Sequence, residues 1–238
     1  MPNAKFLFYI LTTYERTGWI CKELAEFIAY APYVYADVGC QVGFAHNFSP
    51  AASARNTICK RWKDSSFEWI VMCDNDMAPG MDILKCVDGA PEDAGIVVPA
   101  FHLWNQTNVE LTMCWGPKDS GRFQDGKAAQ FPPGFYELYK CGTGFIFIRP
   151  WVFDKIDYPY FRYAYNEDAG MTHTEDIVFC EEVQRKGIKI YGNSAYRVGH
   201  YHTVQLATLE DFGKKMLDIH LAALKESDSM AVSPAEQG

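Results

Sequence analysis

The first hundred residues alternate between short apolar runs and segments with helical periodicity. Four apolar runs predict strands over residues 6–11, 33–38, 67–73 and 95–101. Helices are predicted between them over residues 19–29, 49–62 and 81–87, the second opening on Ser49-Pro50 as N-cap and first helical residue. This order predicts an α/β fold with a mostly parallel central sheet and helices on both faces. Such sheets bind ligands at the carboxyl ends of their strands, so we expect functional side chains in the loops that follow the strands.

The second half of the chain is less regular. It predicts a buried strand over 144–149, two short strands over 188–191 and 196–198, and helices over 174–186 and 209–225. Residues 116–134 are rich in Gly, Pro and charged residues, which is typical of a loop. Because no linker or repeat interrupts the pattern, we expect one domain over residues 1–226 and a disordered tail over 227–238.

Composition excludes several classes of protein. The longest apolar runs are about six residues, whereas a membrane-spanning helix needs about 20, so we expect no membrane span. No secretory signal is recognisable, and we expect a cytoplasmic protein. The 22 basic and 30 acidic residues give a net charge of −8, which disfavours a nucleic-acid partner. The eight cysteines include no C-x-x-C pair and are interpreted as free, mostly buried thiols.

The sequence Asp74-Asn75-Asp76 directly follows the apolar run Trp69–Cys73. Two aspartates at positions i and i+2 can approach one hard cation together, and Mg²⁺ or Mn²⁺ is usually shared between such carboxylates and substrate phosphates. A site of this kind holds a diphosphate and neutralises its charge as it leaves. A simple turn remains the alternative, since Asp and Asn are common turn residues.

A second acidic group, Thr174-Glu175-Asp176, begins the predicted helix 174–186. The helix dipole favours acidic residues in a first turn, which is a sufficient structural explanation. The functional alternative is that one carboxylate faces the ligand crevice and removes a proton from an attacking hydroxyl.

His200 follows the short predicted strand 196–198, and His202 lies two residues further on. A neutral imidazole is a good ligand for a transition metal, so His200 is a candidate third ligand beside the aspartates. A hydrogen-bonded structural histidine is the alternative, although neither histidine lies in an apolar run.

Three further segments allow both a structural and a functional interpretation. Arg55 could contact a phosphate or clamp the strand that carries the aspartates. Gly142-Thr143-Gly144 could let the backbone approach a ligand, or could form a tight turn into a buried strand. The aromatic residues of segment 158–165 could stack on an acceptor sugar, although ordinary packing is slightly favoured.

Taken in this order, these segments resemble the GT-A fold glycosyltransferases, and most of all the large inverting family that includes cellulose and chitin synthases. The resemblance covers residues 5–203, and the matching segments are Ala54–Asn56, Trp69–Asp76, Cys141–Arg149, Thr174–Asp176 and Gly199-His200.

The resemblance implies a UDP- or GDP-sugar as donor, a Mn²⁺ or Mg²⁺ ion, and a glycan or small hydroxyl compound as acceptor. It implies that Asp76 and His200 bind the metal, with Asp74 near the metal or the ribose, and that Asp176 is the catalytic base beside Glu175. The residues that it implies for the nucleotide-sugar site are Thr12, Thr13, Tyr14, Asp37, Arg55, Asn75, Gly142, Thr143 and Gly144.

The sequence also departs from that family. It lacks a Q-x-x-R-W motif and membrane helices, which argues against a processive polymer synthase and favours a single sugar transfer. It is also similar to retaining GT-A enzymes such as mannosylglycerate synthase, so the stereochemistry stays open. Three more interpretations stay open as well: a nucleotidyltransferase, a binding domain without catalysis, and sugar transfer to nucleic-acid bases. The first is disfavoured, because the Gly-rich loop usual after the first strand of a nucleotidyltransferase is missing.

Overall fold

The computed structural model describes residues 4–12, 20–46, 50–105, 110–113, 115–117, 131–168, 170–201 and 214. The chain divides into two units, one of residues 1–103 with 112–201 and one of residues 104–111 with 202–238. Almost all of the described residues belong to the first unit. Lys214 is helical, but the rest of the predicted helix 209–225 and the predicted tail lie outside the described residues. The single domain over 1–226 therefore stays a prediction.

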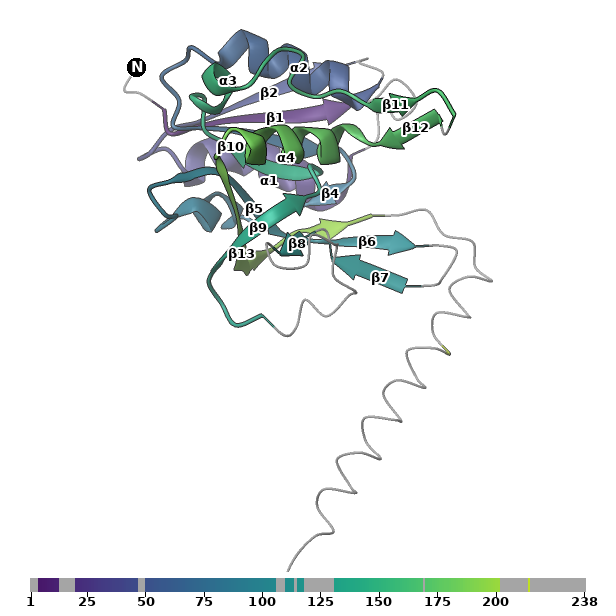
Figure 1. Ribbon diagram of the computed structural model, residues 1–238. Coiled ribbons are helices and arrows are strands. Elements are labelled where there is room, and N and C mark those ends of the chain that lie inside the picture. The colour runs from purple at the N-terminus through teal and green to yellow at the C-terminus, as the bar shows by residue number, and fades with distance from the viewer. Residues whose placement is uncertain are drawn as a thin grey trace, which may run out of the picture. The chain divides into compact units, whose positions relative to one another are not determined.

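The first unit is built on an eight-stranded sheet with the order β2-β1-β3-β10-β5-β13-β9-β8 (Figure 1). β1 pairs in parallel with β2 and β3, and β5 pairs in parallel with β13. β10 and β9 run the other way, because each pairs antiparallel with its neighbours on both sides. The strands are β1 (Phe6–Thr12), β2 (Cys40–His46), β3 (Trp69–Asp74), β5 (Ala94–Ala100), β8 (Trp115–Pro117), β9 (Phe135–Cys141), β10 (Phe145–Ile148) and β13 (Lys189–Arg197).

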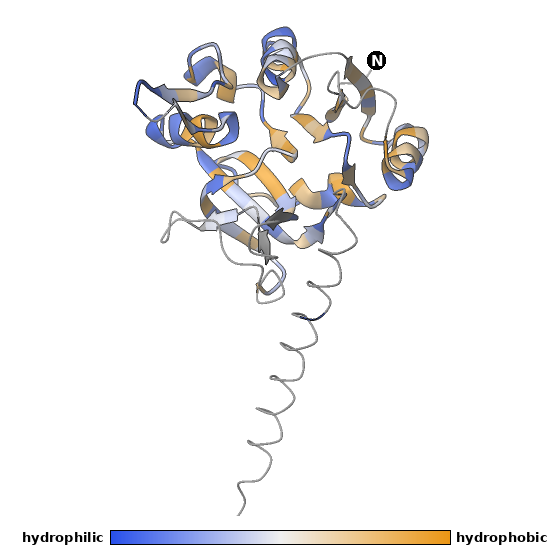
Figure 2. Ribbon diagram, turned by 90° about the vertical axis from the view of Figure 1, so that its right-hand side faces the viewer, coloured by the Kyte–Doolittle hydropathy of each residue, from blue (hydrophilic) through white to orange (hydrophobic). Residues whose placement is uncertain are grey.

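The central strands are buried along nearly their whole length. Every residue of β5 and β10 is buried, as are all residues of β3 except the last. Continuous burial requires cover on both faces, which explains why these strands read as unbroken apolar runs. Figure 2 shows the hydrophobic residues gathered on these inner strands.

Helices cover both faces of the sheet, as predicted. The connections β1–α1–β2 and β2–α2–β3 run in opposite directions along the sheet, so right-handed crossovers place α1 and α2 on opposite faces. Figure 1 shows α2 above β1 and α1 below it. The helices are α1 (Lys22–Val34), α2 (Ala51–Trp62), the 3₁₀ helix η2 (Ile83–Val87), α3 (Val152–Lys155) and α4 (Glu175–Arg185).

The prediction of a strand over 33–38 is wrong. Helix α1 continues to Val34 with Pro32 inside it, and β2 lies further along the chain, at Cys40–His46. Pro32 removes one helical hydrogen bond, but Tyr35 is buried and its hydroxyl donates to the Met81 carbonyl at 2.6 Å, which holds the end of the helix in place. Tyr33 and Val34, which suggested a buried strand, are exposed.

Other differences concern boundaries and connections. The second helix has Pro50 at its N-cap position, and Ser49 lies outside the described residues. The predicted helix 81–87 is 3₁₀, and the two short strands predicted near the end form one continuous strand, β13. Strands β8 and β9 were not predicted. β8 begins one residue before the segment assigned to a loop and continues into it, and the sequence of β9 shows no regular alternation of apolar and polar residues. Residues 118–130 of that loop are outside the described part.

Three two-stranded sheets complete the described topology. β4 (Met77–Ala78) pairs with β14 (Gly199–His200), β11 (Ala164–Asn166) pairs with β12 (Gly170–His173), and β6 (His102–Asn105) pairs with β7 (Glu110–Met113). No helix in the described ranges has both the length and the apolar character needed to span a membrane.

Candidate active site

A cavity of about 270 Å³ lies where β3 and β5 end and β10 begins. It is lined by most of the residues that sequence analysis singled out, which come from five separate segments of the chain. Its walls are formed by Arg55, Asp74, Phe101, Gly142, Thr143, Gly144, Thr174, Glu175, Asp176 and His200. The position agrees with the general preference of α/β sheets for ligands at the carboxyl ends of their parallel strands.

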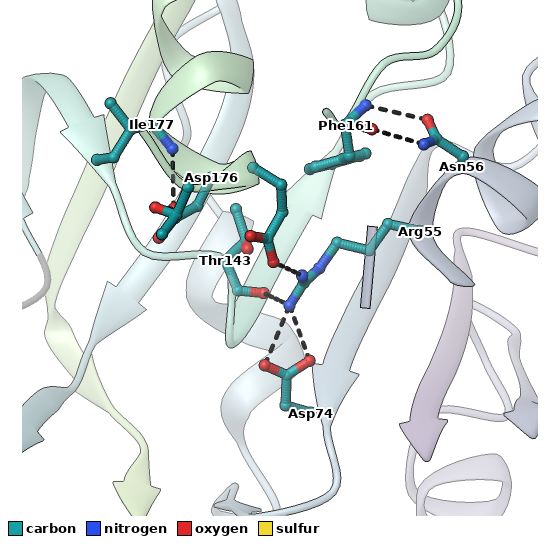
Figure 3. Close-up of polar contacts among 9 residues, drawn as sticks. Arg55, Asn56, Asp74, Thr143, Phe161, Asp176 and Ile177 are labelled. Atoms are coloured by element: carbon teal, nitrogen blue, oxygen red, sulfur yellow. Dashed lines mark hydrogen bonds and ion pairs between the residues drawn. The ribbon is translucent and has the colours of Figure 1, made fainter. Parts of the chain in front are cut away.

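Arg55 joins three walls of this cavity (Figure 3). Arg55 belongs to α2, and the residue is only 2% exposed. Nη2 donates to both carboxylate oxygens of Asp74, at 2.9 and 3.0 Å, and to the Thr143 carbonyl at 3.4 Å. Nη1 donates to Oε1 of Glu175 at 2.8 Å. Arg55 therefore clamps the end of β3 to the beginning of α4.

The electrostatics of this clamp are strongly coupled. Burial alone would lower the pKa of Arg55, but Asp74, Glu175 and Asp176 raise it, so the guanidinium stays charged. Burial raises the pKa of Asp74 to about 6, although Arg55 opposes this shift. Two acidic groups thus share one buried cation, and the balance of charge inside the cavity depends on Arg55.

The pairing of β4 with β14 brings His200 beside Asp76. His200 stands opposite Met77 in this ladder, and the Tyr201 amide donates to the Asp76 carbonyl at 2.9 Å. Nε2 of His200 lies 3.6 Å from Oδ2 of Asp76. On its other side, Nδ1 lies 2.9 Å from the carbonyl oxygen of His102, which suits a protonated Nδ1.

The pair formed by Asp76 and His200 fits a divalent cation. A carbonyl partner on Nδ1 is the usual arrangement behind a metal-ligating histidine. The 3.6 Å separation is too long for a hydrogen bond and is compatible with two ligands that each approach one ion to about 2.1 Å. Mg²⁺ is typically held by one or two carboxylates together with substrate phosphates, so a protein need not supply a full cage.

The predicted trio of Asp74, Asp76 and His200 is not assembled as a three-ligand site. Within the described ranges, no group of three or more His, Cys, Asp or Glu side chains is arranged to hold a metal ion. The reason is the Arg55 clamp, because both carboxylate oxygens of Asp74 accept hydrogen bonds from the guanidinium.

Glu175 and Asp176 occupy the first turn of α4 but have different surroundings. Glu175 is ion-paired with Arg55, whereas Asp176 accepts hydrogen bonds from the Ile177 amide at 2.9 Å and from the Thr174 hydroxyl. Figure 3 shows the Asp176 carboxylate turned away from Arg55. Both carboxylates line the cavity, but Asp176 is the one that is not engaged by the buried cation.

The segment Gly142-Thr143-Gly144 forms the cavity wall beside Asp74. β10 runs antiparallel to β3, and the Gly144 carbonyl accepts a hydrogen bond from the Asp74 amide at 2.8 Å. A Cβ atom on Gly144 would lie 3.2 Å from Met77 Sδ and 3.4 Å from the Phe101 ring, so the absence of a side chain allows this close approach. The segment serves both as a tight entry to β10 and as cavity lining.

Several predicted residues are not brought to the cavity. Asp37 lies in the turn before β2, beside Lys5 at the opposite end of β1, because the strand expected to carry it is not formed. Thr12 ends β1 with its hydroxyl donating to the Ala45 carbonyl at 3.2 Å, and Asn75 is buried within the turn. Thr13 and Tyr14 lie outside the described residues.

The structure adds residues that sequence analysis did not single out. Phe101 lines the cavity and contacts the His200 ring edge-on, with the two ring centroids 6.0 Å apart. His102 supplies the carbonyl oxygen that lies beside Nδ1 of His200. Both follow β5, so the rule that strand ends carry function could have indicated them. Within the aromatic segment, Tyr160 and Phe161 are buried, as the packing interpretation predicted, whereas Tyr158 and Tyr165 are exposed.

Comparisons with known proteins identify the fold. No family model matches the sequence, and no curated protein matches it. Among solved structures, the chain is similar to protein A197 from STIV, with a TM-score of 0.57, 18% identity, and coverage of 84% of this chain and 86% of that one. It is also similar to GalNAc-T7 with UDP, GalNAc and Mn²⁺, with a TM-score of 0.51 and 12% identity. That match covers 84% of this chain but only 44% of the other. The chain has the GT-A glycosyltransferase fold, as predicted.

Proposed function

We propose that this protein is a metal-dependent glycosyltransferase that moves one sugar from a UDP- or GDP-sugar to a hydroxyl acceptor. The observation that carries the proposal is the convergence of Asp74, Asp176, His200 and the Gly142–Gly144 segment on one cavity. The GT-A fold supports it, as does the similarity to a GalNAc-T7 structure that holds UDP, GalNAc and Mn²⁺.

In this proposal, Asp76 and His200 would hold the divalent cation. Their donor set, one carboxylate and one imidazole, suits Mn²⁺. When bound, the cation would neutralise the negative charge that develops on the leaving diphosphate.

Asp176 is proposed as the general base. Its carboxylate takes the proton from the acceptor hydroxyl while the hydroxyl oxygen bonds to the anomeric carbon and the bond from that carbon to the diphosphate breaks. The products are the glycosylated acceptor, a nucleoside diphosphate and protonated Asp176, which returns the proton to water. Direct attack of this kind inverts the anomeric configuration. Glu175 is less suited to the role, because its carboxylate is paired with Arg55 at 2.8 Å.

Arg55 acts as a positioning residue and not as a phosphate ligand in this mechanism. The guanidinium is buried and donates to Asp74, Glu175 and the Thr143 carbonyl. Its function is to set the distance between the aspartate turn and the first turn of α4, which carries the base.

The proposal is tested with a panel of UDP- and GDP-sugars, assayed for release of nucleoside diphosphate in the presence of MnCl₂. We expect release from at least one donor, loss of release with EDTA, and a loss of at least about 100-fold in Asp76→Asn and in His200→Gln. Asp157→Asn, which changes an exposed carboxylate that does not line the cavity, is the matched control. Undiminished release in EDTA, or full activity of Asp76→Asn, refutes metal dependence.

A second experiment separates the base from its neighbour. Asp176→Asn should bind the nucleotide with unchanged affinity in calorimetry but lose about 10²–10⁴-fold in transfer rate, whereas Glu175→Gln should lose less. The anomeric configuration of the product, read by NMR, should be inverted. Retained configuration, or transfer by Asp176→Asn at the wild-type rate, would show that Asp176 is not the base.

A further inference from the structure

Hairpin β11–β12 carries two large apolar side chains that are open to solvent. Tyr165 is 72% exposed and Met171 is 53% exposed. The two residues are cross-strand partners in the hairpin, so their side chains lie on the same face. We call this pair the hairpin platform. Figure 1 shows that the hairpin extends beyond the main sheet at the end toward which β1 points.

The hairpin platform is directly connected to the proposed catalytic residues. β12 ends at His173, and the next three residues are the N-cap Thr174 and the first-turn acids Glu175 and Asp176. On the other strand, burial and the interaction with Glu175 raise the pKa of Tyr163, which stands immediately before β11. Both strands of the hairpin therefore begin or end at the rim of the cavity.

The charges around the hairpin platform and the neighbouring cavity rim disfavour an anionic acceptor. Asp74, Glu175 and Asp176 line the cavity, and Glu167 and Asp168 are exposed at the turn of the hairpin. Among the described lining residues, Arg55 is the one Arg or Lys, and its guanidinium is buried against two of these acids. A chain of phosphodiesters would meet these acidic side chains, and the exposed Arg162 just before Tyr163 is already ion-paired with Glu182 at 3.5 Å. A neutral ligand would not be repelled.

An exposed tyrosine beside a methionine suits one class of neutral ligand well. A pyranose ring presents a face of C–H groups that packs on an aromatic ring, and its hydroxyls can bond to the phenol oxygen. Methionine adds a flexible apolar surface that adapts to ring shape. A bare small alcohol would gain nothing from such a platform outside the cavity.

We propose that the acceptor is a neutral saccharide, and that a sugar unit beyond the reacting one docks on Tyr165 and Met171. This inference rests on the proposed function, because it assigns the acceptor of that same site. It makes Tyr165 a determinant of acceptor choice and leaves donor binding to the cavity.

The probes are cellobiose, maltose, lactose and N,N′-diacetylchitobiose, with binding measured by saturation-transfer NMR and titration. We expect at least one disaccharide to bind, and its affinity to fall about tenfold in Tyr165→Ala and several-fold in Met171→Ala. Tyr165→Trp should retain binding, and Tyr33→Ala, which removes an exposed tyrosine on α1, is the matched control. Because Tyr165 is exposed, all variants should melt close to the wild-type temperature.

Binding of UDP and GDP, measured in the same variants, separates this inference from the proposed function. Nucleotide binding without binding of any of the four disaccharides, or disaccharide binding unchanged in Tyr165→Ala, overturns the saccharide platform and leaves the transferase proposal standing. Disaccharide binding that depends on Tyr165 in a protein that releases no nucleoside diphosphate overturns the transferase and keeps the saccharide site. Binding of a short single-stranded oligonucleotide that depends on Tyr165 overturns the neutral-saccharide assignment.

Discussion

Replacement of Arg55 by methionine is the sharpest test of the clamp that organises the cavity. Met has a similar apolar stem but no charge, so Asp74 and Glu175 would face each other without a counter-ion. Removing one partner of a buried ion pair typically costs about 3–5 kcal/mol of unfolding free energy. The Arg55 and Glu175 side chains are 3% and 14% exposed but Asp74 is 32% exposed, so we expect a value near the lower limit, about 3 kcal/mol.

That loss should be visible in both chemical and thermal unfolding. For a chain of this length, about 3 kcal/mol corresponds to a fall of about 6–12 °C in melting temperature. Arg61→Met removes an exposed cation from the same helix and should change stability by no more than about 0.5 kcal/mol. The double variant Arg55→Met with Glu175→Gln should recover at least about 0.5–1 kcal/mol, because it removes one of the two unpaired carboxylates.

The pH dependence of the unfolding free energy provides an independent check on the direction of the Asp74 pKa shift. Burial raises the pKa of Asp74 to about 6, above its unfolded value, so the folded protein binds more protons than the unfolded chain between about pH 4 and 6. The contribution of Asp74 to the free energy of unfolding is fully present below about pH 4 and is lost as the pH rises through about 6. Without Arg55 the pKa should rise further, so the deficit of Arg55→Met should be larger at about pH 8 than at about pH 5. A variant within about 1 kcal/mol of wild type at the higher pH, or a deficit that grows on acidification, would refute the reasoning.

Two further predictions concern the elements that frame the cavity. Asn56→Ala should lower the free energy of unfolding, measured with denaturant, by about 2–3 kcal/mol, because the Asn56 amide makes hydrogen bonds of 2.7 and 3.0 Å to the backbone of Phe161. Thr57→Ala, at an exposed position of the same helix, is the control, and equal stabilities of the two variants would contradict the expectation. Burial raises the pKa of Tyr35 to about 12. The contribution of Tyr35 to the free energy of unfolding is therefore fully present below about pH 10 and is lost between about pH 10 and 12. Tyr35→Phe should therefore be about 1 kcal/mol less stable at about pH 9, with a gap that narrows by about pH 11, and a constant gap would argue against the shift.

Local patterns were sufficient for much of the architecture. The apolar runs of β1, β3 and β5 predicted buried parallel strands, since strands covered on both faces have no polar positions to alternate. The acidic first turn of α4 and the Gly187 that follows it predicted that helix closely, because capping depends on neighbours in the sequence. The aspartate turn after β3 was likewise placed by local sequence at the end of a strand, where ligands bind.

The tertiary structure alone decided how these pieces meet. His200 reaches Asp76 because a two-residue ladder joins β14 to β4, which lie far apart in the chain, and nothing near either residue encodes that pairing. Arg55 could have faced a phosphate or a protein partner, and its burial between Asp74 and Glu175 settles which of these it contacts in the folded chain. The aromatic segment divides into buried Phe161 and exposed Tyr165 only once packing is known. Periodicity and caps report on residues close in sequence, whereas long-range pairing, burial and shared charges depend on the whole fold.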